Sequence, residues 1–348
     1  MLFRYKIKPV SPIITPLMSD TIFGHFCWAI RYEKGEKFLQ DFLATYQDGN
    51  SPPVIFSSAF ISGYLPRPVL PLPKRKQMTG FMEKFFINDP DGLFPKKSDK
   101  QKRFEGMSKI KEWNKRQFIS LENWLALKDD YSEYRLQEMF YTHFKNGADK
   151  ESVTTKSEIT ASNTLSRISG SVAEDGGGLF SREKIWFHHG TELDLYVMAE
   201  SDESASLTGW FLTKYLPETG FGKDKSIGMG ILDIKADKAF NPDIFNVVKP
   251  NACMVLSLSS FEGIGTYRSF YRLKTKFGKL GGDFAFSSPS GGAPKPFKKP
   301  LLMMEPGSVF FTTEQINAKE LTGNVHSDDR IRHCGLPVTL PLKIKEDR

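Results

Sequence analysis

Four glycines and two lysines stand within eleven residues in the stretch GFGKDKSIGMG, residues 220–230. Because glycine has no Cβ, its backbone reaches positive φ and lets amide N–H groups approach a phosphate. Lysine side chains beside such a loop would supply the countercharge. We therefore expect the loop to line an RNA-binding groove through Gly220, Gly222, Lys223, Lys225 and Ser226. The alternative is a glycine-rich connection between packed elements.

Two familiar nucleotide-binding loops do not fit this stretch. A P-loop needs four residues between its glycine and Gly-Lys-Ser/Thr, and a dinucleotide fingerprint needs G-x-G-x-x-G at the start of a helix. Here the third residue after Gly222 is Lys225, and the pattern predicts a helix before the loop (Ser206–Leu216) and a strand after it (Ile231–Lys235). No helix N-terminus follows to hold a pyrophosphate.

A second basic stretch lies between residues 264 and 300. It holds eight Lys/Arg against one acid, Asp283, and aromatic residues are interleaved with them. Cations that follow phosphates and rings that stack on bases are typical of single-strand binding, so we favour RNA contact over a solvated loop. The candidate residues are Tyr267, Arg268, Tyr271, Arg272, Lys274, Lys276, Lys279, Lys295, Lys298 and Lys299.

The N-terminal segment must position part of this chemistry. Alternation of polar and apolar residues predicts a strand over residues 3–8, and 3.6-residue spacing predicts a helix over Thr21–Tyr32, capped by Ser19 or Asp20. One face of that helix carries Thr21, His25, Trp28 and Tyr32. These residues could meet RNA, although packing between domains is the favoured use of a Trp/Tyr face.

Length and composition indicate a two-domain globular protein. The chain has 348 residues and a formal charge of +7, which favours acidic partners. Its three cysteines show no C-x-x-C pairing, and the His188-His189 pair has no further ligands at a recognisable spacing, so we expect no disulfide framework, metal or cofactor. We find neither a signal peptide nor a membrane span, and we expect a cytoplasmic protein.

Three further segments divide the chain. Val54–Ile61 is expected to be a strand. The charged stretch from about 74 to 147 reads as a helical insertion, for which a solvated surface is favoured over direct RNA contact. The stretch from about 150 to 190 begins poor in large apolar residues, which indicates an extended hairpin arm containing Arg167, with a turn at residues 188–190.

Several of these motifs, in this order, resemble the RAMP proteins of CRISPR systems. They are SDTIFGHF (residues 19–26), RISG (167–170), the G-x-G-x5-G-x-G loop and HCGLPV (333–338). The resemblance is strongest to the type III-A (Csm) subunit that holds the 5′ tag of the guide RNA. It implies an α+β fold of two tandem ferredoxin-like modules, residues 1–240 and 241–348, with the helical insertion and a β-hairpin thumb.

The resemblance also implies a non-catalytic scaffold with three partners: the crRNA 5′ tag, the large polymerase-like signature subunit and the first backbone RAMP subunit. No small-molecule substrate is expected. The main alternative is a metal-independent endoribonuclease that processes precursor crRNA, with His25 as general acid or base because an imidazole titrates near neutral pH. A purely structural adaptor is disfavoured by the basic and aromatic stretch.

Overall fold

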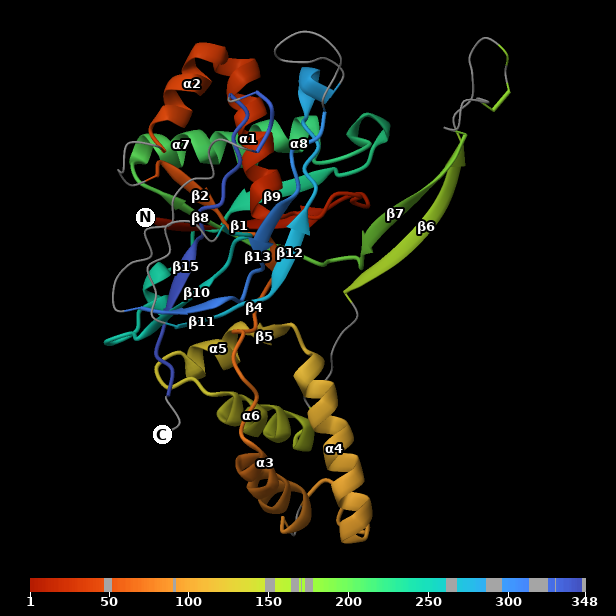
Figure 1. The fold of residues 1–348 in the computed structure, drawn as a ribbon, viewed down its shortest axis with the longest axis vertical. Coiled ribbons are helices and arrows are strands. Elements are labelled where there is room, and N and C mark those ends of the chain that lie inside the picture. The colour runs from red at the N-terminus through yellow and green to blue at the C-terminus, as the bar shows by residue number, and fades with distance from the viewer. Residues whose placement is uncertain are drawn as a thin grey trace.

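The protein combines helices with several small antiparallel sheets (Figure 1). This computed structural model describes residues 1–46, 52–89, 92–147, 154–163, 169, 171–172, 178–260, 268–285, 296–312, 325–328 and 330–345. The elements of the N-terminal part (residues 1–240), apart from an insertion and a hairpin, are β1 (Leu2–Pro9), α1 (Ser19–Lys34), α2 (Glu36–Ala44), β2 (Val54–Phe56), β3 (Phe60–Ile61), β8 (Leu193–Ala199), α7 (Asp202–Trp210), the π-helical turn η2 (Phe211–Tyr215), α8 (Leu216–Thr219), the 3-10 turn η3 (Lys225–Ile227) and β9 (Leu232–Ala236).

The N-terminal part is built on one antiparallel sheet with the strand order β2-β8-β1-β9, and β3 also pairs with β8. In the register of β1, Tyr5 lies opposite Leu195 and Ile7 opposite Ile234. With β2 and β3 counted as one interrupted strand, and with α2, the insertion and the hairpin left out, the chain order is strand, helix, two strands, helix, strand. The strand predicted at residues 3–8 is thus present as the centre of this sheet.

Helix α1 covers the sheet with an apolar stripe at helical spacing. Ile22, Phe26 and Ile30 are at most 1% exposed, and the Phe26 ring lies 5.1 Å from that of Phe211 and 5.4 Å from that of Phe56. The predicted cap is wrong by one or two residues. Met18 is the N-cap and makes no side-chain cap bond. Ser19 and Asp20 lie inside the first turn, and their side chains bond to Leu258 and Lys276.

The predicted strand over Val54–Ile61 is two short strands with a break at residues 57–59. At the break, the Ser58 N–H donates to the Leu256 carbonyl at 2.9 Å and the Ala59 N–H to the Leu17 carbonyl at 2.9 Å. The ladder is interrupted because these two amides bond instead to Leu256 in the C-terminal part and to Leu17 in the segment before α1.

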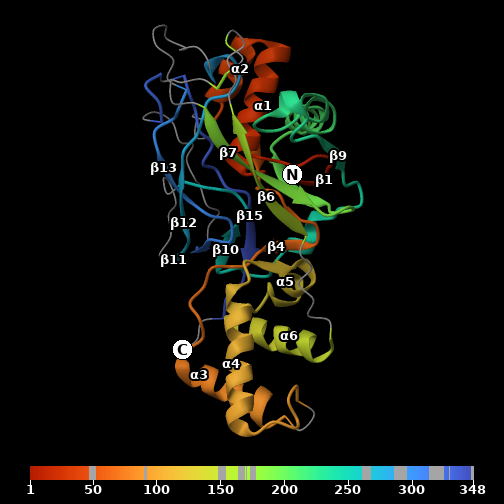
Figure 2. The same ribbon diagram turned by 90° about the vertical axis from the view of Figure 1, so that its right-hand side faces the viewer.

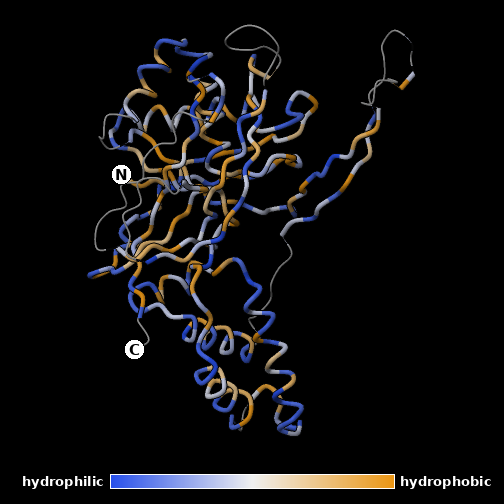
Figure 3. The backbone as a smooth tube through the Cα atoms, in the orientation of Figure 1, coloured by the Kyte–Doolittle hydropathy of each residue, from blue (hydrophilic) through white to orange (hydrophobic). Residues whose placement is uncertain are grey.

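The insertion forms a separate helical body below the sheets (Figure 1). Phe86, Trp113 and Phe140 lie inside it, each at most 4% exposed, and they belong to the same hydrophobic cluster as the residues that pack on the sheets. In Figure 3 hydrophilic residues predominate along its longest helix. Its elements are β4 (Tyr64–Pro66), α3 (Arg75–Phe81), the π-helical turn η1 (Met82–Ile87), α4 (Asp99–Lys115), β5 (Phe118–Ser120), α5 (Leu121–Leu127) and α6 (Glu133–Lys145).

The expected hairpin arm is present and projects from the body of the molecule (Figure 1). Strand β6 (Thr155–Asn163) pairs antiparallel with β7 (Leu179–Phe187) along its whole length. The turn at residues 188–190 follows β7, as predicted. Arg167 lies outside the described residues.

The C-terminal part (residues 241–345) holds a four-stranded antiparallel sheet in the order β11-β14-β10-β15 and a two-stranded sheet of β12 and β13. In its described residues the only helices are 3-10 turns. The basic stretch supplies two of these strands, β11 and β12. The elements are η4 (Pro242–Phe245), β10 (Ala252–Val255), β11 (Arg268–Phe270), β12 (Leu273–Lys276), η5 (Gly282–Ala285), β13 (Leu301–Met304), β14 (Val309–Phe311) and β15 (Thr339–Leu342).

One hydrophobic core runs through both parts of the chain, from Phe26 and Tyr196 to Met254 and Leu340. Ser257 Oγ also donates to the Phe56 carbonyl at 2.8 Å, which ties the second sheet to the first. Seen from the side, β11, β12 and β13 lie on one flank and β1 and β9 on the other (Figure 2). Helix α1 is therefore positioned to contact both parts.

Candidate RNA interface

The glycine loop is tightly folded, and its glycines are required by its geometry. Gly220, Gly222, Gly228 and Gly230 have φ of +74°, +79°, +88° and +69°. A Cβ on Gly230 would lie 1.9 Å from the Phe221 carbonyl oxygen, so only glycine fits there. The Phe221 N–H donates to the Gly230 carbonyl at 2.9 Å and closes the loop.

Several amides of the loop already have partners in the protein. The Gly222 N–H donates to His25 Nε2 at 3.1 Å, and the Lys223 N–H to Thr15 Oγ1 at 3.0 Å. The Gly230 N–H donates to the Pro12 carbonyl at 2.9 Å. These amides therefore hold the loop to α1 and to the segment that precedes it. Gly220 and Gly222 shape the site without offering N–H groups to a phosphate.

The amides free to bind an anion come later in the loop. Within the described residues, the N–H groups of Asp224, Lys225 and Ser226 have no protein acceptor. Asp224 has a left-handed backbone, φ +61°, and the next residues turn right-handed. Such a sequence of conformations points successive N–H groups into one concavity that suits an anion. Lys223, Lys225 and Ser226 are exposed around it, as an RNA-binding loop requires.

His25 is held in a structural role beside the loop. Its ring packs on Phe221 with centroids 4.7 Å apart, and its Nε2 accepts the Gly222 N–H. Burial, with the charge of Lys225, lowers the pKa of His25 to about 4. A general acid or base works best with a pKa near the operating pH. This arrangement therefore favours the scaffold over the endoribonuclease.

The base of the hairpin lies against the same loop. Ile13 and Ile185 exchange backbone hydrogen bonds of 3.0 and 2.8 Å, which joins β7 to the segment before α1. Arg182 of β7 forms an ion pair with Asp224, Nε to Oδ2, at 2.9 Å. Thr15, Arg182 and Asp224 were not among the site residues predicted from the sequence. Only the K-D-K pattern could have singled out Asp224, as an acid between two cations.

The polar and aromatic face of α1 contacts both the glycine loop and the C-terminal part. Lys276 Nζ lies 3.1 Å from Thr21 Oγ1, and the Trp28 ring lies 5.3 Å from that of Phe284. Tyr32 lies next to Gly282. This face of α1 therefore packs between the two parts, which was the favoured interpretation.

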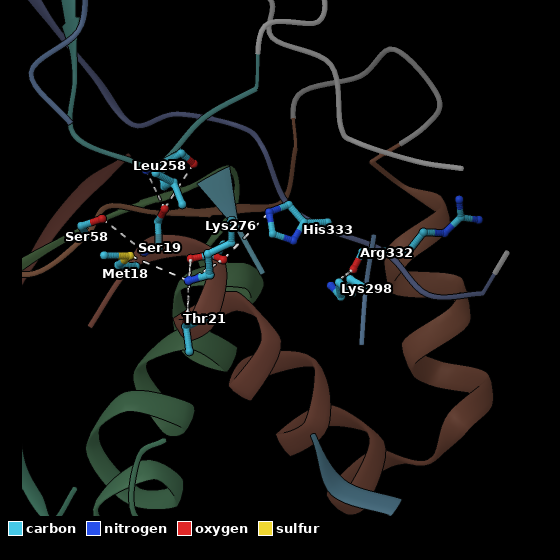
Figure 4. Close-up of polar contacts among 10 residues, drawn as sticks. Met18, Ser19, Thr21, Ser58, Leu258, Lys276, Lys298, Arg332 and His333 are labelled. Atoms are coloured by element: carbon cyan, nitrogen blue, oxygen red, sulfur yellow. Dashed lines mark hydrogen bonds and ion pairs between the residues drawn. The ribbon is translucent and has the colours of Figure 1, made fainter. Parts of the chain in front are cut away.

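Two lysines of the basic stretch are engaged inside the protein. Lys276 Nζ lies 3.0 Å from Asp20 Oδ2 (Figure 4), and Lys298 Nζ donates to the Arg332 carbonyl at 2.6 Å. Burial lowers the pKa of Lys298 to about 8. Both lysines are among the residues predicted to contact RNA, and that contact stays a prediction for two cations that already have partners in the protein. Their partners lie far away in the sequence, so spacing along the chain could not show that these charges are satisfied.

The other residues of the basic stretch differ in their surroundings. Arg268 stacks on the rings of Phe270 and Phe311, and Arg272 lies 3.5 Å from Glu305. Tyr271 is 43% exposed. Among the described residues, no ion pair involves the exposed Arg268, Lys279 and Lys299 or the half-buried Lys274. Tyr267 and Lys295 lie outside the described residues.

A charged cluster lies between α1 and the C-terminal part, with Asp20 and His333 buried and Lys276 and Lys298 half-buried; Figure 4 labels the last three. The His333 Nε2 lies 3.9 Å from Asp20 Oδ2, and both side chains are 3% exposed. Burial, together with Lys298, lowers the pKa of His333 to about 3. The cluster fixes the start of α1, and with it the helix that supports the glycine loop.

We expect stability to fall as the pH is lowered from about 6.5 toward 4. The folded pKa of both His25 and His333 lies below the ordinary histidine value of about 6.5, so the unfolded chain binds more protons in this window. Each histidine should remove about 1.4 kcal/mol of unfolding free energy per pH unit. Urea unfolding at a series of pH values checks this.

A matched variant pair separates the histidines from other acid effects. His333→Gln should flatten the dependence between pH 6.5 and 4, whereas the exposed His189→Gln should leave it unchanged. An equal slope in both variants would contradict the assignment.

None of the helices in the described part of the chain combines the length and the apolar character that crossing a bilayer requires. Within the same residues, no group of three or more His, Cys, Asp or Glu side chains is placed to hold a metal ion.

No protein-family model matches the sequence, and no curated protein matches it either. Solved structures do match over the whole chain. One is the crystal structure of a Csm1-Csm4 cassette in complex with cA4, with 15% identity, a TM-score of 0.54 and full coverage of both chains. A Csm1-Csm4 cassette in complex with AMPPNP gives 14% identity and a TM-score of 0.51, again with full coverage of both chains.

A further match is to the Csm3-Csm4 subcomplex of the type III-A CRISPR-Cas interference complex. It shows 13% identity and a TM-score of 0.51, and it covers 98% of this chain and 99% of the other. At these identities the likeness concerns the fold. In fold, the chain is therefore similar over its whole length to Csm4, a RAMP subunit of type III-A complexes.

Proposed function

We propose that this protein is a non-catalytic, RNA-binding scaffold subunit of a type III-A CRISPR interference complex in the cytoplasm, where it holds the 5′ repeat-derived tag of the crRNA. The proposal rests mainly on the concavity formed by the N–H groups of Asp224, Lys225 and Ser226, which have no acceptor among the described residues. Exposed lysines and the base of the hairpin flank this concavity. Full-length fold similarity to Csm4 supports it.

The proposal includes two ferredoxin-like modules, residues 1–240 and 241–348. The strand order of the first sheet supports the first module. The second has a four-stranded sheet without α-helices in its described residues, so its elements depart from the expected pattern. The hairpin acts as the thumb, with Arg167 at the RNA.

The proposed bridging role rests on the other subunits that are present in the matching structures. Their Csm4 chains were solved with Csm1 and with Csm3. We infer that this chain likewise joins the large polymerase-like signature subunit to the first backbone RAMP subunit. Isolation of the native complex and sequencing of its RNA tests the whole proposal: a population sharing one repeat-derived 5′ end supports tag holding, and shortening of precursor RNA by the protein alone would favour the endoribonuclease.

Exchange of Lys223 and Lys225 for glutamate should weaken RNA binding and reduce its salt dependence. Each phosphate contact contributes about 0.7 to the slope of log K against log salt for a single strand, so the loss should be about 1.4. Fluorescence anisotropy with a tag-containing RNA over a salt series measures it.

The control replaces two exposed lysines of the same part of the chain, Lys235→Glu with Lys238→Glu, which lie on and after β9. It changes the net charge equally and should leave the slope nearly unchanged. Equal loss in both variants would assign the effect to net charge and remove the glycine loop from the site.

A further inference from the structure

The longest helix of the insertion, α4, has a basic outer face that nothing in the described structure covers. Residues 96–116 hold nine Lys/Arg and three Asp/Glu. The face that points inward is fixed by Gly106, Ile110 and Trp113, which are buried against the rest of the insertion. A Cβ on Gly106 would lie 2.8 Å from both Met82 and Phe86, so the helix packs closely there and cannot rotate.

The opposite face is a stripe at helical spacing. Lys100, Phe104, Met107, Lys111 and Lys115 occupy positions i, i+4, i+7, i+11 and i+15, and all five side chains are exposed. Phe104 is 76% exposed and Met107 is 49% exposed. At about 1.5 Å per residue the stripe runs roughly 22 Å along the helix.

The lysines of the stripe differ from other lysines nearby. Lys97 pairs with Glu105 at 2.7 Å, Lys109 with Glu112 at 2.8 Å, and Lys102 donates to the Ile87 carbonyl at 3.1 Å. Within the described residues, Lys100, Lys111 and Lys115 have no such partner. Glu105 and Glu112 are thus paired with lysines outside the stripe, and no ion pair within the described residues neutralises the three stripe lysines.

We propose that the stripe of α4 is a second binding surface for single-stranded RNA, separate from the glycine loop. Unpaired cations in a row would follow the phosphates, and the exposed Phe104 ring would stack on a base, which are the two components of sequence-tolerant single-strand binding. A partner protein with an acidic surface would use the cations and bury Phe104 and Met107 together. The spread of lysines over about four helical turns around one aromatic ring fits a polyanionic strand better.

The test uses the full-length protein and a mixed-sequence single-stranded RNA several times longer than the stripe. Lys111→Gln with Lys115→Gln should lower the salt slope of binding by about 1.4, at about 0.7 per phosphate. Phe104→Ala should weaken binding about fivefold or more by loss of stacking. Ultraviolet cross-linking followed by mass spectrometry should place RNA on the peptide that contains Phe104.

The control is Lys34→Gln with Lys37→Gln, two exposed lysines at the end of α1 and the start of α2. It removes the same charge from helical surface elsewhere and should leave the slope unchanged. Because all these side chains are exposed, circular dichroism and thermal unfolding should match those of the unaltered protein.

An unchanged slope in the Lys111/Lys115 variant, or no cross-link on α4, would overturn the proposal and leave the stripe as a surface for an acidic protein. The result is independent of the proposed function, since the Lys223/Lys225 variant tests the glycine loop by itself. Loss in one variant and not in the other identifies which of the two surfaces binds RNA.

Discussion

Asp20→Ala is expected to destabilise the protein by about 3 kcal/mol or more. The Asp20 carboxylate is 3% exposed, receives Lys276 at 3.0 Å and lies in the first turn of α1, where the helix dipole favours a negative charge. Its removal leaves Lys276 beside the buried Lys298 without a countercharge. Breaking a buried pair from one side typically costs about 3 to 5 kcal/mol. Urea unfolding at neutral pH measures the loss.

A matched exposed pair provides the control for this prediction. Glu105→Ala breaks the Lys97–Glu105 ion pair, whose side chains are 39% and 40% exposed, and should cost less than about 1 kcal/mol. The double variant Asp20→Ala with Lys276→Met should recover part of the loss, because the orphaned charge is then gone. If Asp20→Ala costs no more than Glu105→Ala, the buried cluster does not hold α1 in place.

The sequence allowed good predictions where local periodicity determines the structure. Strand β1 and helix α1 followed from alternation and from the apolar stripe of Ile22, Phe26 and Ile30, because a half-buried strand and a sheet-covering helix repeat their burial within a few residues. The hairpin was predicted from another local property, the polar composition of its segment. The break between β2 and β3 could not be predicted, since the Ser58 N–H bonds to Leu256, far along the chain.

The sequence was enough to predict which loop forms the candidate site, but only some of the residues that take part in it. Glycines with lysines identified the loop, yet the amides of Gly222 and Lys223 bond to His25 and Thr15, about 200 residues away in the sequence. Lys276 is likewise satisfied by Asp20, 256 residues away. Whether a cation is free or paired is decided by contacts of this range, and local spacing does not encode them.

Gly230→Ala is expected to abolish the loop geometry and most RNA binding at the glycine loop. A left-handed backbone costs a non-glycine residue roughly 1 to 2 kcal/mol, and here the new Cβ would also lie 1.9 Å from the Phe221 carbonyl oxygen. Relief of that overlap must break the Phe221 N–H to Gly230 carbonyl bond and the Gly230 N–H to Pro12 bond, both of 2.9 Å. The amides of Asp224, Lys225 and Ser226 then lose their common orientation.

Gly228, in the same loop, provides a control for the strain of a left-handed backbone. It has φ +88° and no atom within 4 Å of the Cβ position, so Gly228→Ala carries only the strain of the left-handed backbone. Anisotropy with a tag-containing RNA should therefore show a loss of affinity of about tenfold or more for Gly230→Ala, since a common orientation of the three amides is what makes a concavity for an anion. The loss for Gly228→Ala should be much smaller. Equal affinities for the two variants would mean that loop closure at Phe221 does not shape the phosphate site, because the two variants differ in that contact while sharing the backbone strain.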